Sequence, residues 1–195
     1  TTQADEQEFH RLLAYKLRQL PRYDAVLLGD DAALLFAMRY QQELFPDTPM
    51  AFFCVNDPEL ARTAAQNPQI SGVRENMDYD RNIALIQQIL PNTKRIVGIS
   101  DSTLTGLGDQ RQFWENAAHH PELEFSLLNP SQYTQEELAQ KLQEMEEGSV
   151  LLYLTMFEDG DKNTYTIQSA AQFLAASSNV PIFRMSIGGM GTGVM

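Results

Sequence analysis

Polar residues follow several apolar runs of the sequence, and their types suit the binding of a small polar molecule. Asp30-Asp31 follows residues 25–28, Asn56-Asp57 follows residues 52–55, and Asp101 with Thr103 follows residues 95–100. In an open α/β sheet, ligands bind beyond the carboxyl ends of the strands. The candidate binding residues are therefore the polar or aromatic residues at these ends: Asp30, Asn56, Asp57, Ser100, Asp101, Thr103, Thr155, Phe157, Asp159 and Ser186.

Several of these residues also have a purely structural interpretation. Asp30 or Asp31 can cap the following helix as well as contact a ligand. The hydroxyls and backbone N–H groups of residues 101–103 could hold a ligand carboxylate, or they could form an N-cap with a local Asx or Ser/Thr turn. Phe157 suits an aromatic or amino-acid ligand, although a loop phenylalanine can equally be part of the core. The sequence leaves these alternatives open.

Catalytic, metal and nucleotide sites have no positive support. An Asp30-Asp31 phosphoacceptor would need a lysine at a neighbouring strand end, and none of these strands ends in lysine. The glycine-rich residues 188–193 follow a strand, but no helix follows to hold a pyrophosphate. His119-His120 point about 100° apart on a helix, which does not suit a shared metal. We therefore expect a protein that is not an enzyme and uses neither a cofactor nor a metal.

The charge of the chain disfavours anionic partners. Its 195 residues carry a formal net charge of -12, so nucleic acid and anionic lipid surfaces would be repelled. The longest apolar run is far shorter than the roughly 20 residues of a transmembrane helix. Cys54 is the only cysteine, which excludes an internal disulfide, and its apolar neighbours predict that it is a small buried core residue.

Apolar runs alternate with helical periodicity along most of the chain, which predicts an α/β fold with parallel sheets flanked by helices. The unbroken run 25–28 is typical of a strand buried on both faces. Further strands are expected at 50–55, 69–73, 95–100, 123–128, 150–156 and 181–185. Helices are expected at 3–20, 31–45, 59–66, 78–90, 109–120, 134–146 and 167–176.

The expected organisation is two lobes with a cleft between them. Residues 1–91 form an N-terminal lobe, 92–185 a C-terminal lobe, and 186–195 a hinge or return segment. The boundary between the two lobes is expected near Pro91-Asn92, where a helix ends and a new strand begins.

One family resemblance rests on the order and spacing of several features. These are Asn56-Asp57-Pro58 after a strand, a turn at residues 71–73, a helix before Leu90-Pro91-Asn92, the strand 95–99 and the glycine-rich segment 188–193. Together, from about residue 24 onward, they resemble the substrate-binding proteins of ABC transporters. They are similar also to the related extracytoplasmic sensor domains of membrane histidine kinases and diguanylate cyclases.

This resemblance implies a type I periplasmic-binding-protein fold, with two Rossmann-like lobes that close on a ligand by hinge motion. Against the family pattern, the opening strand–helix–strand is absent, so the first lobe is expected to be truncated. An exposed edge of its sheet would then offer a surface for a homodimer.

The function expected from the resemblance is that of a sensor domain on the periplasmic or extracellular side of a bacterial membrane protein. Its partners would be a small organic ligand and a membrane-attached output domain. Arg74 and Arg184 are the only bases near the strand ends, which favours an amino acid or neutral metabolite. The alternatives are an ABC transporter component with the same fold, and an α/β enzyme of the flavodoxin-like or hydrolase kind.

Overall fold

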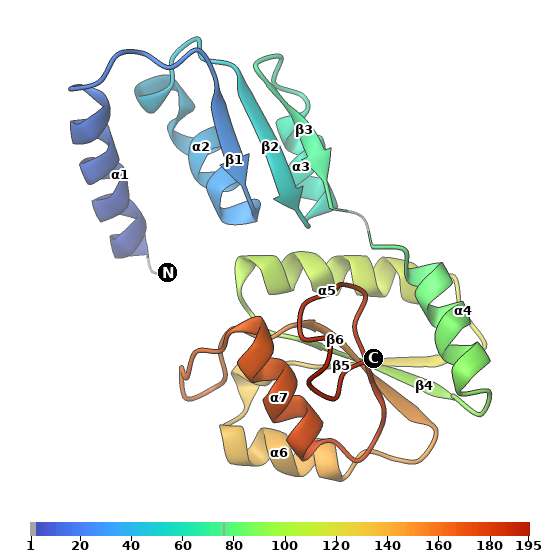
Figure 1. The fold of residues 1–195 in the computed structure, drawn as a ribbon. Helices are drawn as coiled ribbons and strands as arrows, with labels where there is room; N and C mark the ends of the chain where they lie inside the picture. The colour runs from blue at the N-terminus through green and yellow to red at the C-terminus, as the bar shows by residue number, and fades with distance from the viewer. Residues whose placement is uncertain (1–2, 76) are drawn as a thin grey trace. The chain divides into compact units, whose positions relative to one another are not determined.

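A computed structural model describes residues 3–75 and 77–195 of the chain (Figure 1). Its contacts divide the chain into two compact units, Thr1–Glu75 and Asn76–Met195. The sequence placed the boundary later, between residues 91 and 92. The difference arises from helix α4 (Tyr79–Ile89), because its buried Tyr79, Ile83 and Ile86 share a core with Ile96 of the second unit.

The first unit is a three-stranded parallel sheet with helices. Its elements are α1 (Gln3–Leu17), β1 (Val26–Gly29), α2 (Asp31–Leu44), β2 (Met50–Val55), α3 (Pro58–Ala64) and β3 (Ile70–Arg74). The strand order is β1-β2-β3, with Leu28 opposite Phe52. Leu28 and Phe52 pack with Leu34 of α2 and Ala61 of α3 in one core. The predicted turn at residues 71–73 lies inside β3.

The opposite face of this sheet is exposed, which corrects the prediction that the first strand is buried on both faces. Leu27 of β1 is 74% exposed, Phe53 of β2 49% and Val73 of β3 73%. The cause is that the core of the unit lies on the other face, where α2 and α3 cover the strands (Figure 1). An apolar run therefore does not show whether one face of a strand is covered or both.

Cys54 is exposed, so the prediction of a buried core residue was wrong. The register between β2 and β3 shifts between Phe52 and Val55, and Cys54 adopts a φ of 54° there. A bulge of this kind reverses the alternation of side chains along a strand. The sequence carried no signal for it.

The second unit has a four-stranded parallel sheet in the order β5-β4-β6-β7. Its strands are β4 (Arg95–Ser100), β5 (Glu124–Leu128), β6 (Ser149–Thr155) and β7 (Ile182–Phe183). The helices are α4 (Tyr79–Ile89), α5 (Leu104–Ala117), the short η1 (Pro130–Gln132), α6 (Gln135–Gln143) and α7 (Ile167–Ser177). These positions confirm the predicted strand–helix alternation.

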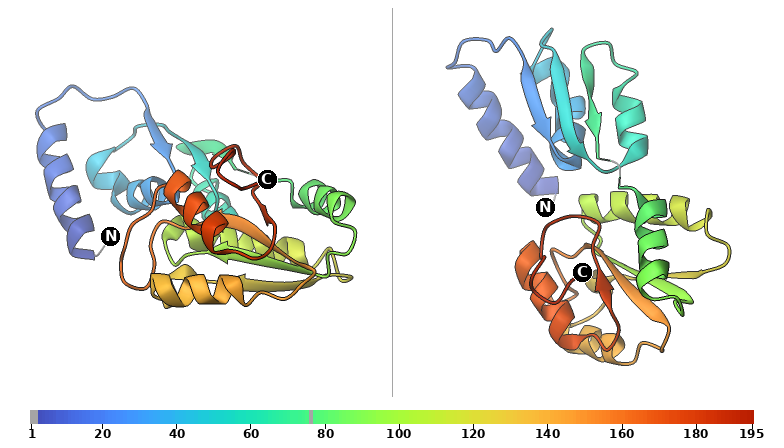
Figure 2. Two further views of the ribbon diagram at one scale, coloured as in Figure 1. Left: turned by 60° about the horizontal axis from the view of Figure 1, so that its bottom comes forward. Right: turned by 45° about the vertical axis from the view of Figure 1, so that its right-hand side comes forward.

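Helices cover both faces of this second sheet. Val97 and Leu151 point into a core with α6 and α7, while Ile96 and Leu152 point into a core with α4 and α5. Every residue of β6 is buried, as expected for a central strand between two helical layers. Figure 2 shows these layers from two further directions.

The C-terminal residues 186–195 fold back onto α7. A Cβ added at Gly189 would lie 2.9 Å from Ala171 Cβ, and one at Gly193 would lie 2.7 Å from Ala175 Cβ. Both glycines also have positive φ, so the close approach and the backbone conformation each favour glycine. The Met195 N–H donates to the Ile182 carbonyl at 2.9 Å. This segment thus packs on the second unit, with Val194 in its core, and the role of the segment as a hinge stays a prediction.

Candidate functional site

Asp30 joins the end of β1 to the start of α2 at the carboxyl edge of the first sheet. It has a φ of 79°, and its carboxylate accepts from the Asp31 N–H at 2.6 Å. Its own N–H donates to the Phe53 carbonyl of β2 at 3.0 Å. The side chain itself is exposed, which leaves Asp30 accessible to a ligand.

Asp31 connects the ends of the first two strands. Its side chain is 3% exposed, and its two carboxylate oxygens accept from the backbone N–H groups of Asn56 at 3.2 Å and Asp57 at 2.9 Å. Asp57 in turn caps α3 by accepting from Glu59 N at 2.9 Å. The structure therefore brings Asp30, Asn56 and Asp57 together, through an aspartate that the sequence assigned only to capping or ligand contact.

Asp101 plays the corresponding part in the second unit, between β4 and β6. It is fully buried, and one carboxylate oxygen accepts from the backbone N–H groups of Phe157 and Glu158. The other accepts from the Thr103 N–H at 3.0 Å and from the Thr103 hydroxyl. Asp101, Thr103 and Phe157 thus lie together as predicted, but Asp101 is enclosed and holds the backbone.

The first turn of α5 is built closely onto this aspartate. Thr103 is the N-cap, and its hydroxyl accepts from Gly106 N at 3.1 Å. A Cβ on Gly106 would lie 2.4 Å from the Asp101 carbonyl oxygen, so the turn needs glycine. The buried Ser100 hydroxyl donates to the Gly106 carbonyl at 2.9 Å. The sequence predicted a start at residue 109 because Gly106 and Gly108 are poor helix formers.

Thr155 is also buried, and its hydroxyl donates to the carboxylate of Asp109 on α5. Burial raises the pKa of the nearby Tyr79, and the charge of Asp109 raises it further. Ser100, Asp101 and Thr155 are thus 5% exposed or less. They support the backbone at the strand ends and are enclosed by the protein.

Asp159 organises its own loop after β6. Its carboxylate accepts from the Asp161 and Asn163 N–H groups at 3.0 Å, from the Asn163 amide at 2.9 Å and from the Tyr165 hydroxyl at 2.8 Å. Burial acts to raise the pKa of Asp159, but the hydrogen bonds from Asn163 and Tyr165 outweigh it and the pKa is lowered. Burial and the Asp159 carboxylate raise the pKa of Tyr165 to about 12.

Replacing Tyr165 with phenylalanine should destabilise the protein by about 1.5 kcal/mol at pH 7, the scale for a hydrogen bond to a charged group. The lowered pKa of Asp159 stabilises the fold above its unfolded pKa near 4, and this contribution disappears as the pH falls through the lower folded pKa. Urea midpoints of the variant and wild type should therefore differ at pH 7 and converge as the pH falls through the lowered folded pKa of Asp159.

Tyr133→Phe is the matched control for Tyr165→Phe. The Tyr133 ring contacts Lys141, and its hydroxyl has no described hydrogen bond within residues 77–195. Equal effects of the two substitutions, or a Tyr165→Phe effect independent of pH, would contradict the assigned role of the Tyr165 hydroxyl.

Ser186 is tied to Arg184. Arg184 Nε donates to the Ser186 hydroxyl oxygen at 2.9 Å, and Nη1 donates to the Leu154 carbonyl at 3.1 Å. The guanidinium also lies over the Tyr153 ring, 4.2 Å from its centroid. Arg184 is therefore engaged by the protein itself, which keeps this edge poor in available positive charge.

The end of β5 adds residues that the sequence reasoning missed. The Asn129 amide donates to the Ser102 hydroxyl oxygen at 2.9 Å, and the Ser131 hydroxyl oxygen accepts from Ser102 N at 3.0 Å. Asn129 directly follows a predicted strand, so the strand-end rule would have identified it. Asp31 stood at a predicted strand end and was assigned only to capping or ligand contact, whereas Asp109 lies inside α5, where its position gave no such signal.

The accessible groups at the second edge are hydrogen-bonding and aromatic. Ser102 is exposed, Phe157 is 37% exposed, and Glu158 and Ser131 are half-buried. They can donate and accept hydrogen bonds and provide an apolar contact, which suits reversible binding of an organic molecule. Within the described residues, no three His, Cys, Asp or Glu side chains gather to hold a metal, and no helix is long and apolar enough to cross a membrane.

Solved structures with the same arrangement of elements exist at low sequence identity. The ABC domain in complex with L-Trp from Streptococcus pneumonia matches with a TM-score of 0.64 and 16% identity, over 94% of this chain and 64% of that one. A ligand-free, open substrate-binding protein with adhesive properties from Clostridium difficile matches with a TM-score of 0.62 and 15% identity. The chain has the type I periplasmic-binding-protein fold.

An extracellular ligand-binding receptor from Verminephrobacter eiseniae shares the periplasmic-binding-protein fold at a TM-score of 0.60 and 14% identity. The chain spans 64% of the Streptococcus protein, 63% of the Clostridium protein and 49% of this receptor. No family model matches the sequence, and no curated protein does. The predicted fold class is thus confirmed by structure, at an identity where sequence comparison finds no relative.

Proposed function

We propose that this chain binds a small organic molecule at the carboxyl ends of its parallel strands, as part of an extracytoplasmic protein. One observation carries the proposal. In each unit, polar side chains gather at this edge, around Asp31 in the first and Asp101 in the second, and the edge is where open α/β sheets bind ligands. The periplasmic-binding-protein fold of the chain supports the same function.

The exposed chemistry favours an amino acid or a neutral metabolite. Asp30 offers a carboxylate, Ser102 a hydroxyl and Phe157 an aromatic ring, while Arg184 is already engaged. A carboxylate can pair with a ligand ammonium, and an aromatic ring can stack on an apolar side chain or contact a cation. A multiply charged anion would find few partners. One structural neighbour was solved with L-Trp, so aromatic amino acids come first in any panel.

We further propose that the chain is the sensor domain of a bacterial membrane protein, attached to a histidine kinase or diguanylate cyclase output domain. The support is the order of features from Asn56-Asp57-Pro58 onward, which resembles such sensors. The alternative is the substrate-binding component of an ABC transporter. Kinase or cyclase sequence downstream in the same gene would support the sensor, and a separate gene beside transporter genes would support the alternative.

Replacing Phe157 with alanine should weaken ligand binding by about tenfold, the scale of an aromatic contact with its buried area. The measurement is calorimetric titration with L-Trp and then the other amino acids. Phe9→Ala is the matched control, because Phe9 is also an exposed aromatic, 55% accessible, but lies on α1. If Phe157→Ala left the affinity unchanged, the carboxyl edge of the second sheet would not be part of the binding site.

A further inference from the structure

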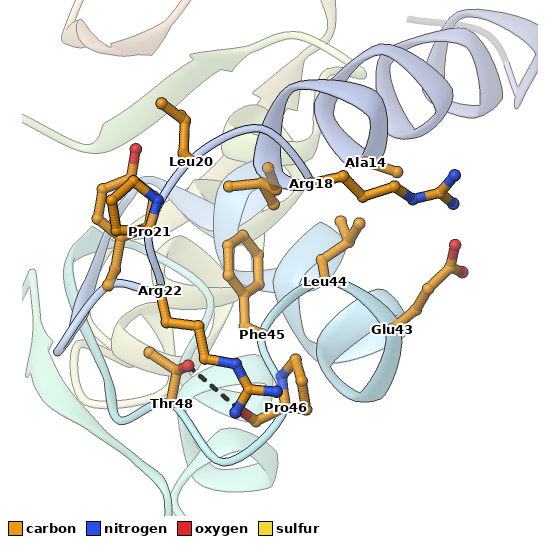
Figure 3. Close-up of a pocket in the computed structure, with 12 residues that line it drawn as sticks. Ala14, Arg18, Leu20, Pro21, Arg22, Glu43, Leu44, Phe45, Pro46 and Thr48 are labelled. Atoms are coloured by element: carbon orange, nitrogen blue, oxygen red, sulfur yellow. Dashed lines mark hydrogen bonds between the residues drawn. The ribbon is translucent and has the colours of Figure 1, made fainter.

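A hollow of about 200 Å³ lies in the first unit, where α1, the segment 18–23 and the end of α2 meet (Figure 3). Segment 18–23 leads into β1, and Thr48 precedes β2. The hollow is therefore at the edge where these strands begin, which is the opposite edge of the sheet from Asp30 and Asn56. It is separate from the site proposed above.

The floor of the hollow is apolar and well packed. Leu44 and Phe45 are each 9% exposed and Ala14 is 8% exposed, and all three belong to the core of the unit. Figure 3 shows the Phe45 ring at the centre, with Leu20 and Pro46 near it. A rigid apolar floor of this kind binds a compact hydrocarbon group rather than a free ion.

Arg22 provides the positive charge at the rim. Its guanidinium lies beside Thr48 and Pro46, and within residues 3–75 no carboxylate is described as its partner (Figure 3). Arg39 and Arg62 of the same unit do have such partners, with Glu6 at 2.5 Å and Glu59 at 2.7 Å. In a chain with a net charge of -12, an arginine left without a carboxylate beside an apolar hollow is a ready partner for an anion.

Glu43, the acidic residue that lines the hollow, already contacts another residue of the protein. Glu43 Oε2 lies 3.0 Å from His10 Nε2, so its carboxylate is directed toward α1. In Figure 3 the Arg18 side chain extends on the same side as Glu43, away from Arg22. The Thr48 hydroxyl donates to the Pro46 carbonyl at 3.3 Å and is therefore engaged, and Arg22 is the charged donor on this side of the hollow.

We propose that this hollow binds a small organic carboxylate with a compact apolar body. The carboxylate pairs with the Arg22 guanidinium, and the body contacts Phe45 and Leu44. The hollow is somewhat larger than the ~150 Å³ apolar cavity that accepts benzene, so it can hold a group of that size. The ligand class is therefore a monocarboxylate of about the size of benzoate.

Benzoate is the probe, titrated into the full chain labelled with ¹⁵N. The expected result is saturable movement of the amide resonances of residues 18–23 and 44–48. Arg22→Gln should weaken binding about tenfold or more, the scale for a charged hydrogen bond. Arg74→Gln, which removes another exposed arginine of the same unit, should leave the affinity unchanged. Benzyl alcohol, which lacks the charge, should bind at least about tenfold more weakly.

Several results would each overturn the proposal. They are the absence of saturation at millimolar benzoate, equal affinity in Arg22→Gln and wild type, and equal affinity for benzyl alcohol. A larger loss in Arg18→Gln than in Arg22→Gln would also overturn it, because the anchor would then lie on the Glu43 side. Movement of amide resonances confined to residues near Asp30, Asn56 or Phe157 would place benzoate at the strand ends. The titration therefore distinguishes the two sites.

Discussion

Replacing Asp101 with alanine should destabilise the second unit by about 3 kcal/mol or more. The substitution removes the acceptor for the N–H groups of Phe157, Glu158 and Thr103. A hydrogen bond to a charged group contributes about 1.5–3 kcal/mol, and buried donors left without acceptors add a penalty. Trp114, the only tryptophan, lies on α5 and reports on this unit, so its fluorescence midpoint in urea should fall by roughly 1–2 M.

The matched control for this substitution is Asp161→Ala. Asp161 is an exposed aspartate of the same unit, and its removal should change the free energy of unfolding by less than about 0.5 kcal/mol. Asp101→Asn should fall between the two, because the amide retains one acceptor oxygen but brings donors toward the Thr103 N–H. Equal midpoints for Asp101→Ala and Asp161→Ala would show that Asp101 does not hold β4 and β6 together.

Replacing Asp31 with alanine should have a comparable effect on the first unit, again about 3 kcal/mol. The lost bonds are those from the Asn56 and Asp57 N–H groups to the buried carboxylate. Amide hydrogen exchange measures the stability of this unit, which has no tryptophan to report it by fluorescence. Because 1.4 kcal/mol corresponds to a factor of ten, protection of the β1 and β2 amides should fall by about a hundredfold.

Asp24→Ala, in the exposed segment before β1, is the control for Asp31→Ala and should leave the exchange of these amides unchanged. Amides of residues 95–100 in β4 should keep their protection in both variants. If Asp31→Ala left the β2 amides fully protected, the carboxylate would be a helix-start residue without a role in connecting the strands.

Asp31 and Asp101 solve the same physical problem in the two units. The backbone after a strand leaves N–H groups that no neighbouring strand accepts, and a buried carboxylate can accept two of them. In both units the aspartate follows one strand and binds the backbone after the adjacent strand. The exposed side chains around it are then held in fixed positions, which lowers the entropic cost of ligand binding.

Much of the fold could be predicted from the sequence because local signals agreed with the tertiary structure. Asp57-Pro58 predicted the start of α3, and residues 95–100 predicted β4 without error. Tertiary packing overrode the local signal elsewhere. Gly106 obscured the start of α5, and the bulge at Cys54 and the exposed Leu27 depend on which face the helices cover.

The sequence predicted the edge of the sheets at which the candidate site lies, but not which side chains would contact a ligand. Residue type identified Asp101 and Asp159 correctly as residues of the strand ends, yet both are fully buried and hold backbone. Spacing cannot show whether a carboxylate points to solvent or to its own loop. Asp30, Ser102 and Phe157 are among the residues with exposed side chains at these ends.

The most direct test of the central claim is a ¹⁵N chemical-shift titration of the full chain against single amino acids, beginning with L-Trp. Our account predicts that a ligand moves the resonances of residues 101–103, 129–131 and 157–158 in the second unit, or of residues 30–31 and 56–57 in the first. It also predicts stabilisation by about 2.7 kcal/mol at a hundredfold excess over the dissociation constant. Saturable binding that moves none of these strand-end resonances would contradict the account.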